Sequence, residues 1–312
     1  MPHSTPFISL LLTALFSVSA FSEDKATVSA KDKATVSAKG PKFLRFRETD
    51  SQALLETASV KYTHPDGTSV ELIGAVHIAD KPYYSALNEQ FKQYDALLYE
   101  MVGGDPENPP SKEELQSNKN NLMRTLQSSF GKMMKLDFQL DHIDYTAKNF
   151  VHADMSFETF TKRQKAKGES LLSMMLKAQS QAAPGDRKQN LNLSAILKLL
   201  LKNDPTEMKI ELGRQFQDVE SIIAGMEGPD GSVLVAERNI TALKVMKRER
   251  KNGKKNMGIF YGAAHLPDFD KRLREELGFK RGKAIWHPAW TIRKTTAPNK
   301  KPGSAAEKKK AA

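Results

Sequence analysis

The sequence predicts an α/β domain whose mixed sheet comes from two related strand-GxxH-helix halves, with a large helical insertion between them. Two stretches carry this prediction: VELIGAVHIADKPYYSALNEQF (70–91) and MGIFYGAAHLPDFDKRLREEL (257–277). Each runs from an apolar strand through Gly-Ala-x-His and a nearby proline into an amphipathic helix. A mostly helical stretch, about 111–251, separates the two.

Local signals place the elements of the first half. A turn is expected at 64–67 (His-Pro-Asp-Gly), because proline presets φ and glycine accepts a positive φ between two β-rich runs. Asp80 is expected to cap a helix in which Leu87 and Phe91 recur at helical spacing. The run YDALLYE then predicts a short buried strand that ends at Glu100.

The insertion and the second half show similar signals. Ser111 and Glu114 have capping-box spacing and open the helical region, which a polar stretch (179–190) interrupts. Ser156 is a further helix N-cap. Strands return at NMGIFYGAAH (256–265) and at RGKAIWHPAW (281–290), which is expected to close the sheet.

The two ends of the chain are expected to lie outside the domain. Residues 1–20 have a short apolar core and end in Val-Ser-Ala, the small-x-small form of a signal-peptidase site, so we expect export to the periplasm or the medium. An uncleaved N-terminal anchor is the alternative. Residues 21–42 contain a tandem octapeptide and are expected to be a disordered linker. The folded domain is expected over 43–290, followed by a basic disordered tail over 291–312.

Composition excludes several classes of protein. The 312 residues include no cysteine, which excludes disulfides, thiol nucleophiles and cysteine-based zinc sites. The net charge of +11 comes from two segments, 244–255 and 291–312, each with seven basic residues and one acidic residue. No nucleic-acid reader motif accompanies this charge, so we expect no nucleic-acid partner. The tail is expected at most to contact a membrane surface or a polyanion weakly.

The two GxxH histidines, His77 and His265, are the first candidate site residues. Glycine is expected to let the chain turn sharply after each strand, so that the histidine lies at the strand's carboxyl end beside a helix N-terminus. The positive end of that helix disfavours imidazolium, which leaves a neutral ring able to bind a metal or accept a proton. The alternative is that both histidines are caps or core residues without a ligand.

Four further residues are candidates around these histidines. Glu100 closes an apolar strand, and adjacent parallel strands would bring it to His77. Arg238, within an otherwise apolar helix, is expected to orient Glu100 or to stabilise an oxyanion, the alternative being a surface ion pair. His152 is a further possible metal ligand, and Asp154 has less support. The sequence contains no Walker loop, GxGxxG or GxSxG motif.

At these residues the sequence resembles the TraB/GumN family, related to the Tiki proteases and more distantly to erythromycin esterase-like and ChaN-like proteins. The resemblance rests on the order of four motifs, GAVH, YDALLYE, ERN and YGAAHLPDF, over about residues 53–290. It implies an α/β fold with an internal duplication, and metal or catalytic roles for His77, Glu100 and His265 with Arg238 in support. The Tiki branch contains metal-dependent proteases, while other branches resemble peptide-pheromone inhibitors or have no assigned activity.

These observations lead to three hypotheses about function. The first is an exported metal-dependent hydrolase, peptidase-like, in which His77, His265 and Glu100, with His152 as a further ligand, hold Mn, Co or Zn. The second is a non-catalytic protein that binds a peptide or small-molecule ligand in the same cleft. The third is an envelope scaffold that works through its basic tail. The sequence does not settle the oligomeric state.

Overall fold

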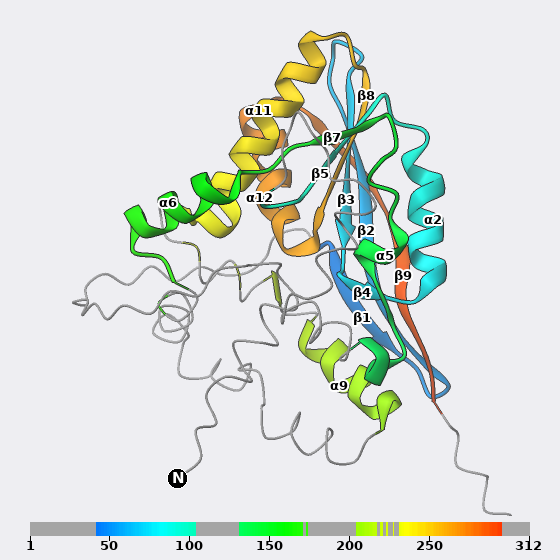
Figure 1. The fold of residues 1–312 in the computed structure, drawn as a ribbon. Coiled ribbons are helices and arrows are strands. Elements are labelled where there is room, and N and C mark those ends of the chain that lie inside the picture. The colour runs from blue at the N-terminus through cyan, green and yellow to red at the C-terminus, as the bar shows by residue number, and fades with distance from the viewer. Residues whose placement is uncertain are drawn as a thin grey trace, which may run out of the picture.

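The computed structural model describes residues 42–103, 131–170, 173, 204–216, 219–220, 223, 227 and 231–294. Their largest element is a seven-stranded sheet with the path β1-β2-β3-β8-β5-β7, to which β9 is added through β2 (Figure 1). Helices pack on the two faces of this sheet. The predicted α/β class with a mixed sheet of parallel and antiparallel strands is therefore confirmed.

The antiparallel part of the sheet is built around one long strand. β2 (Gln52–Thr63) pairs along its whole length with β9 (Lys280–Arg293). On its other edge β2 pairs first with β1 (Leu44–Glu48) and then with β3 (Ser69–Ala75). The turn between β2 and β3 has Gly67 at φ 84°, which confirms the predicted hairpin. β9 runs to Arg293, three residues beyond the predicted closing strand.

The parallel part of the sheet has an order that differs from the prediction. β8 (Asn256–Gly262) lies between β3 and β5 (Ala96–Tyr99), and β7 (Phe150–His152) lies on the far side of β5. The strand that leads to His77 is therefore not adjacent to the strand that leads to Glu100, and that expectation was wrong. All four strands are parallel, so their carboxyl ends lie at one edge of the sheet.

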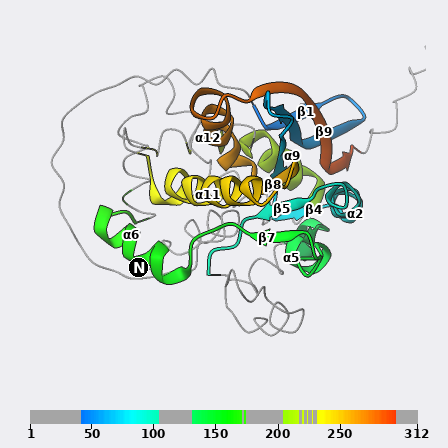
Figure 2. The same cartoon turned by 90° about the horizontal axis from the view of Figure 1, so that it is seen from above.

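Helices cover the parallel strands on both faces, as Figure 2 shows. On one face lie α2 (Lys81–Phe91), α5 (Gln139–His142) and a small sheet of β4 (Ile78–Ala79) and β6 (Asp137–Phe138). On the other lie α11 (Arg238–Lys251) and α12 (Leu266–Lys271), the latter between η4 (Ala263–His265) and η5 (Arg272–Glu276). The side chains of β5 alternate between the two cores, with Leu97 toward α2 and Leu98 toward α11.

The region predicted as a helical insertion contains helices and strands. Its described residues form α5, α6 (Phe157–Lys167), α9 (Pro205–Phe216), η3 (Val233–Glu237) and the whole of α11. The same region also contributes β6 and β7, and β7 joins the main sheet. Ser156 caps α6 by accepting a hydrogen bond from the backbone N–H of Thr159, as predicted.

Asp80 is a case in which the predicted cap is wrong. It occupies the N-cap position of α2, but its side chain makes no capping hydrogen bond. Its Oδ2 instead accepts the backbone N–H of Thr291, 2.6 Å away on β9. The carboxylate thus ties the closing strand to the start of α2.

Several predictions fall on residues that are not described: the signal peptide, most of the linker with its octapeptide, the Ser111 capping box, the polar stretch 179–190 and most of the tail. Among the residues that the structure describes, no helix is both long and apolar enough to cross a membrane.

Candidate functional site

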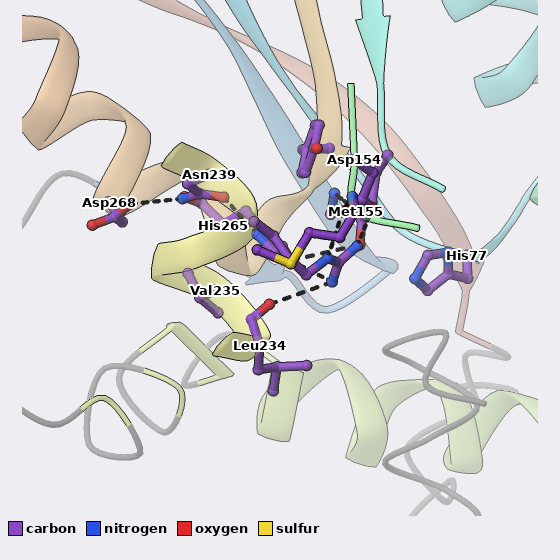
Figure 3. A network of polar contacts seen from close by, with 12 residues as sticks. His77, Asp154, Met155, Leu234, Val235, Asn239, His265 and Asp268 are labelled. Atoms are coloured by element: carbon purple, nitrogen blue, oxygen red, sulfur yellow. Dashed lines mark hydrogen bonds and ion pairs between the residues drawn. The ribbon is translucent and has the colours of Figure 1, made fainter. Parts of the chain in front are cut away.

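The candidate site lies where β3, β8, β5 and β7 end, and α11 supplies side chains to it from one face of the sheet. His77 follows β3, His265 follows β8, Glu100 follows β5, and Asp154 follows β7 by two residues. Figure 3 shows Asp154 between His265 and Asn239 on one side and His77 on the other. Chain segments far apart in the sequence therefore bring their polar side chains to one edge.

The GxxH glycines are needed for close packing and not for a sharp turn, which corrects the expectation. Gly74 lies inside β3, and Gly262 has φ −48° and ψ 135°, a conformation open to any residue. A Cβ at Gly74 would lie 3.3 Å from the carbonyl oxygen of Ala58 and 3.4 Å from Leu266 Cδ2. A Cβ at Gly262 would lie 3.3 Å from Glu100 Oε2. The glycine after β8 therefore leaves room for the carboxylate.

Arg238 is the centre of the site. Its side chain is 1% exposed, and its guanidinium donates from Nε to Asp154 Oδ1 (2.9 Å) and from Nη2 to Asp154 Oδ2 (2.6 Å). Nη2 also donates to Glu100 Oε1 at 2.7 Å. Nη1 contacts the carbonyl oxygen of Leu234 and His265 Nε2, both at 3.3 Å. The predicted role of orienting Glu100 fits these contacts, whereas no N–H group remains free for an oxyanion.

Glu100 is a buried carboxylate held by positive and polar groups. Burial alone would raise its pKa, but the charge of Arg238 together with the contributions of His265, His77 and the Gly262 N–H outweighs this effect, so that the pKa falls to about 2. The backbone N–H of Gly262 donates to Glu100 Oε2 at 2.6 Å. The carboxylate is therefore ionised at neutral pH, and its near contacts come from α11 and β8.

His265 is a buried, neutral imidazole. Burial is the main cause that lowers its pKa to about 4, rather than the expected effect of a helix N-terminus. Asn239 Nδ2 donates to the carbonyl oxygen of His265 (3.0 Å) and to Asp268 Oδ2 (2.8 Å), so its Oδ1 must accept from His265 Nδ1 at 2.7 Å. Nε2 therefore carries the lone pair, and it faces Arg238 with Glu100 Oε1 3.5 Å away.

His77 is the only one of the three predicted site histidines whose side chain is partly exposed. Gln139 Nε2 donates to Tyr145 Oη at 2.7 Å, which leaves Gln139 Oε1 to accept from His77 Nδ1 at 3.2 Å. His77 Nε2 then carries a lone pair, and no described residue hydrogen-bonds to it. Burial is the main cause that lowers the pKa of His77, so the ring is neutral at pH 7.

His152 packs against Tyr99, whose ring in turn packs against Tyr145, but it makes no contact with His77 that would place it in the same hydrogen-bond chain. Its Nε2 donates to the carbonyl oxygen of Met101 at 2.7 Å, which leaves Nδ1 as an acceptor. In the part of the chain that is described, this Nδ1 and the hydroxyl of Tyr99 are buried without a hydrogen-bond partner. The two rings are neighbours, with centroids 5.7 Å apart, and Tyr145 packs against Tyr99 at 5.3 Å. Unsatisfied buried groups of this kind call for a ligand or water.

The residues present do not fit the metal site that the resemblance implies. Within the described ranges, no three His, Asp or Glu side chains are grouped so that they could hold a metal ion. The guanidinium of Arg238 contacts both Glu100 Oε1 and His265 Nε2 and places a fixed positive charge where a cation would share these two ligands.

Sequence reasoning missed part of the site. Asp154, which had less support than His152, is the bidentate partner of Arg238. Asn239 stands next to Arg238 in the ERN motif, and its presence there was the available signal for the group that orients His265. No local pattern in the sequence pointed to Gln139 and Tyr145, because the pairing of β6 with β4 and the packing of α5 on α2 bring this part of the chain to His77.

Comparisons with known proteins found no protein that is significantly similar to this chain. No protein-family model matches the chain, and neither a curated protein nor a solved structure gives a significant match. The resemblance to the TraB/GumN family therefore rests on the four short motifs of the sequence.

Proposed function

We propose that this chain is an exported hydrolase of the TraB/GumN type that cleaves a peptide-like amide bond at the carboxyl edge of β3, β8 and β5. One observation carries this proposal: His77 presents an unpaired Nε2 at that edge while Gln139 fixes its tautomer at Nδ1. A neutral, oriented imidazole with a free lone pair is the arrangement that a general base requires.

In this proposal His77 takes a proton from water as the water attacks the substrate carbonyl, and the resulting imidazolium returns that proton to the amine nitrogen as the C–N bond breaks. Tyr145 is the neighbouring donor for the oxygen that becomes negative, because its Oη accepts from Gln139 and no described group accepts its own proton. Burial is the main cause that raises the pKa of Tyr145 above its usual range, which keeps the hydroxyl protonated.

Glu100, Arg238, Asp154 and His265 serve as a rigid wall of the site. A buried ionic cluster of this size costs desolvation free energy, which is a reason to associate it with function rather than stability. Two carboxylates face one guanidinium, so the wall is net negative while His265 is neutral. A negative wall favours the imidazolium that forms on His77 when it accepts a proton.

A second candidate function is sequestration of a peptide or small ligand without turnover. The observation that favours it is the closed hydrogen bonding of Arg238, whose N–H groups are all used inside the protein. The unpaired Tyr99 hydroxyl and His152 Nδ1 would then serve binding alone.

We also infer that the two strand-GxxH-helix units are related halves. Their strands, β3 and β8, are parallel neighbours, with Gly74 opposite Tyr261 and Ala75 opposite Gly262. This pairing supports a duplication, as does the packing of Gly74 against Leu266 of the second unit.

The hydrolase proposal is tested with a mixed peptide library, scored by mass spectrometry for new termini. We expect the parent chain to cleave, and His77→Gln to be slower by about a hundredfold or more, the usual contribution of a general base. His64→Gln, in the turn between β2 and β3, is the matched control and should cleave like the parent. Equal cleavage by both variants would rule out His77 as the base, and binding without cleavage by the parent would favour sequestration.

A further inference from the structure

The end of the molecule opposite the candidate site is strongly basic. The turn between β2 and β3, the end of α11 and the start of β9 meet there (Figure 1). Arg250 of α11 pairs with Asp66 of the turn at 2.6 Å, Ser69 N–H donates to the carbonyl oxygen of Lys255, and Lys280 is the register partner of Thr63. We call this region the basic pole and define it by its exposed lysines, Lys61, Lys247, Lys251, Lys255, Lys280 and Lys283.

The cations of the basic pole divide into two kinds. Its arginines are already engaged: Arg248 pairs with Glu249 (3.0 Å), Arg250 with Asp66 (2.6 Å) and Arg281 with Asp270 (3.0 Å). The six lysines that define the pole form no ion pair with any acidic residue in the described ranges. The free positive charge of the pole is therefore carried by lysine ammonium groups, which are hydrated point charges on flexible stems.

This kind of charge suits a diffuse anionic surface. The planar fork of arginine is well suited to bidentate reading of base edges in nucleic acid, and the three arginines of the pole are paired with the protein's own carboxylates. Trp286 offers no open stacking surface either, because Arg45 lies over its ring at 4.0 Å. Ile285 is 61% exposed on β9, two residues beyond Lys283, where an apolar side chain can enter a headgroup layer.

We propose that the basic pole binds the surface of an anionic phospholipid membrane. β3 and β8 run from the pole to the candidate site, and seven residues of strand span about 20 Å. Binding through the pole therefore turns the site away from the lipid and toward solutes. This contact belongs to the folded domain, in contrast to the weak contact that the sequence suggested for the tail.

The test is sedimentation of the full chain with vesicles of phosphatidylcholine alone and of phosphatidylcholine mixed with phosphatidylglycerol. The difference between the two vesicles isolates the contribution of charge. We expect binding to the anionic vesicles to weaken as salt rises. The variant Lys247→Gln/Lys251→Gln/Lys255→Gln/Lys280→Gln should bind them at least about tenfold more weakly, since each lysine near such a surface contributes several-fold.

The matched control removes the same number of charges from the tail: Lys301→Gln/Lys308→Gln/Lys309→Gln/Lys310→Gln. It should keep most of the binding, and lysine-to-arginine changes at the four pole positions should keep it too. Unweakened binding by the pole variant, or an equal loss in the tail variant, would overturn the proposal. Tighter binding of the parent to duplex DNA than to anionic vesicles at the same salt would overturn it as well. A pole variant that fails to fold leaves the salt dependence of the parent and the tail variant to decide.

Discussion

At the scale of single residues, Arg238 holds together side chains from three strand ends. It joins Asp154 beyond β7, Glu100 beyond β5 and His265 beyond β8, and its remaining N–H donates to the carbonyl oxygen of Leu234. Removing one partner of a buried ion pair leaves the other charge uncompensated, which costs more than the pair contributes. Loss of Arg238 should therefore destabilise the fold strongly.

We predict that Arg238→Gln lowers the free energy of unfolding by about 3 to 5 kcal/mol. The pKa of Glu100 also rises, because burial is then opposed only by the smaller contributions of His265, His77 and the Gly262 N–H. The measurement is urea denaturation at pH 7, with Arg163→Gln as the control, because Arg163 is 55% exposed in its 2.7 Å pair with Glu237. Equal stability of Arg238→Gln and the parent would show that the cluster is not held as described.

His265 predicts a pH dependence of stability. Its pKa is about 4 in the folded chain and 6.5 as a free imidazole, so between these values the unfolded chain binds a proton that the folded chain does not. Stability should therefore fall as pH drops from 6.5 to 4, by about 3 kcal/mol from this group. Urea denaturation of the parent and of His265→Gln at pH 7 and pH 4 measures it. An identical pH dependence in both proteins would contradict the burial of a neutral ring.

At the scale of elements, β9 pairs along the whole of β2 and continues beyond residue 290, where the sequence placed the end of the domain. Its pairing with β2 continues to Gln52 and Arg293, and Ile292 is buried at 3% exposure. Lys294 adds an ion pair with Glu48 at 2.8 Å. The sequence placed the end of the domain at residue 290, because the basic residues that follow look like a tail.

We predict that a chain ending after Trp290 is less stable than the full chain by at least about 2 kcal/mol, since the side chain of Ile292 is lost from the core. A chain ending after Lys294 should match the full chain, because β9 is complete there. Thermal and urea denaturation of the two truncated chains compares them. Equal stability of both would mean that the last residues of β9 do not contribute to the sheet.

The sequence predicted individual helices and strands better than it predicted which strands lie side by side in the sheet. The hairpin, α2, β5 and the closing strand follow from turn residues and apolar periodicity, which are local signals. The position of β8 between β3 and β5 depends on pairing between residues about 160 to 190 positions apart, which no local pattern encodes. For the same reason His77, Glu100 and His265 could be named from the sequence, but the relay through Gln139 could not.

At the scale of the whole molecule, the strands separate the two surfaces for which we propose functions. Their carboxyl ends hold the buried ionic wall and the free Nε2 of His77, while the opposite end holds exposed lysines. The charged groups of the candidate site are therefore paired with one another, whereas the lysines of the basic pole form no ion pairs within the described residues. The net charge of +11 alone suggested a tail effect and did not show this division.

The central claim is that His77 acts beside a cluster whose cationic position is filled by Arg238. The most direct test is the rate of peptide-library hydrolysis by the full chain after treatment with a chelator, measured before and after adding Mn, Co or Zn. We predict that cleavage persists in the stripped chain and that His77→Gln slows it by about a hundredfold or more. Cleavage that disappears on chelation and returns only with one of these metals would contradict the account, and would require Arg238 to leave Glu100 and His265 so that they can bind the ion.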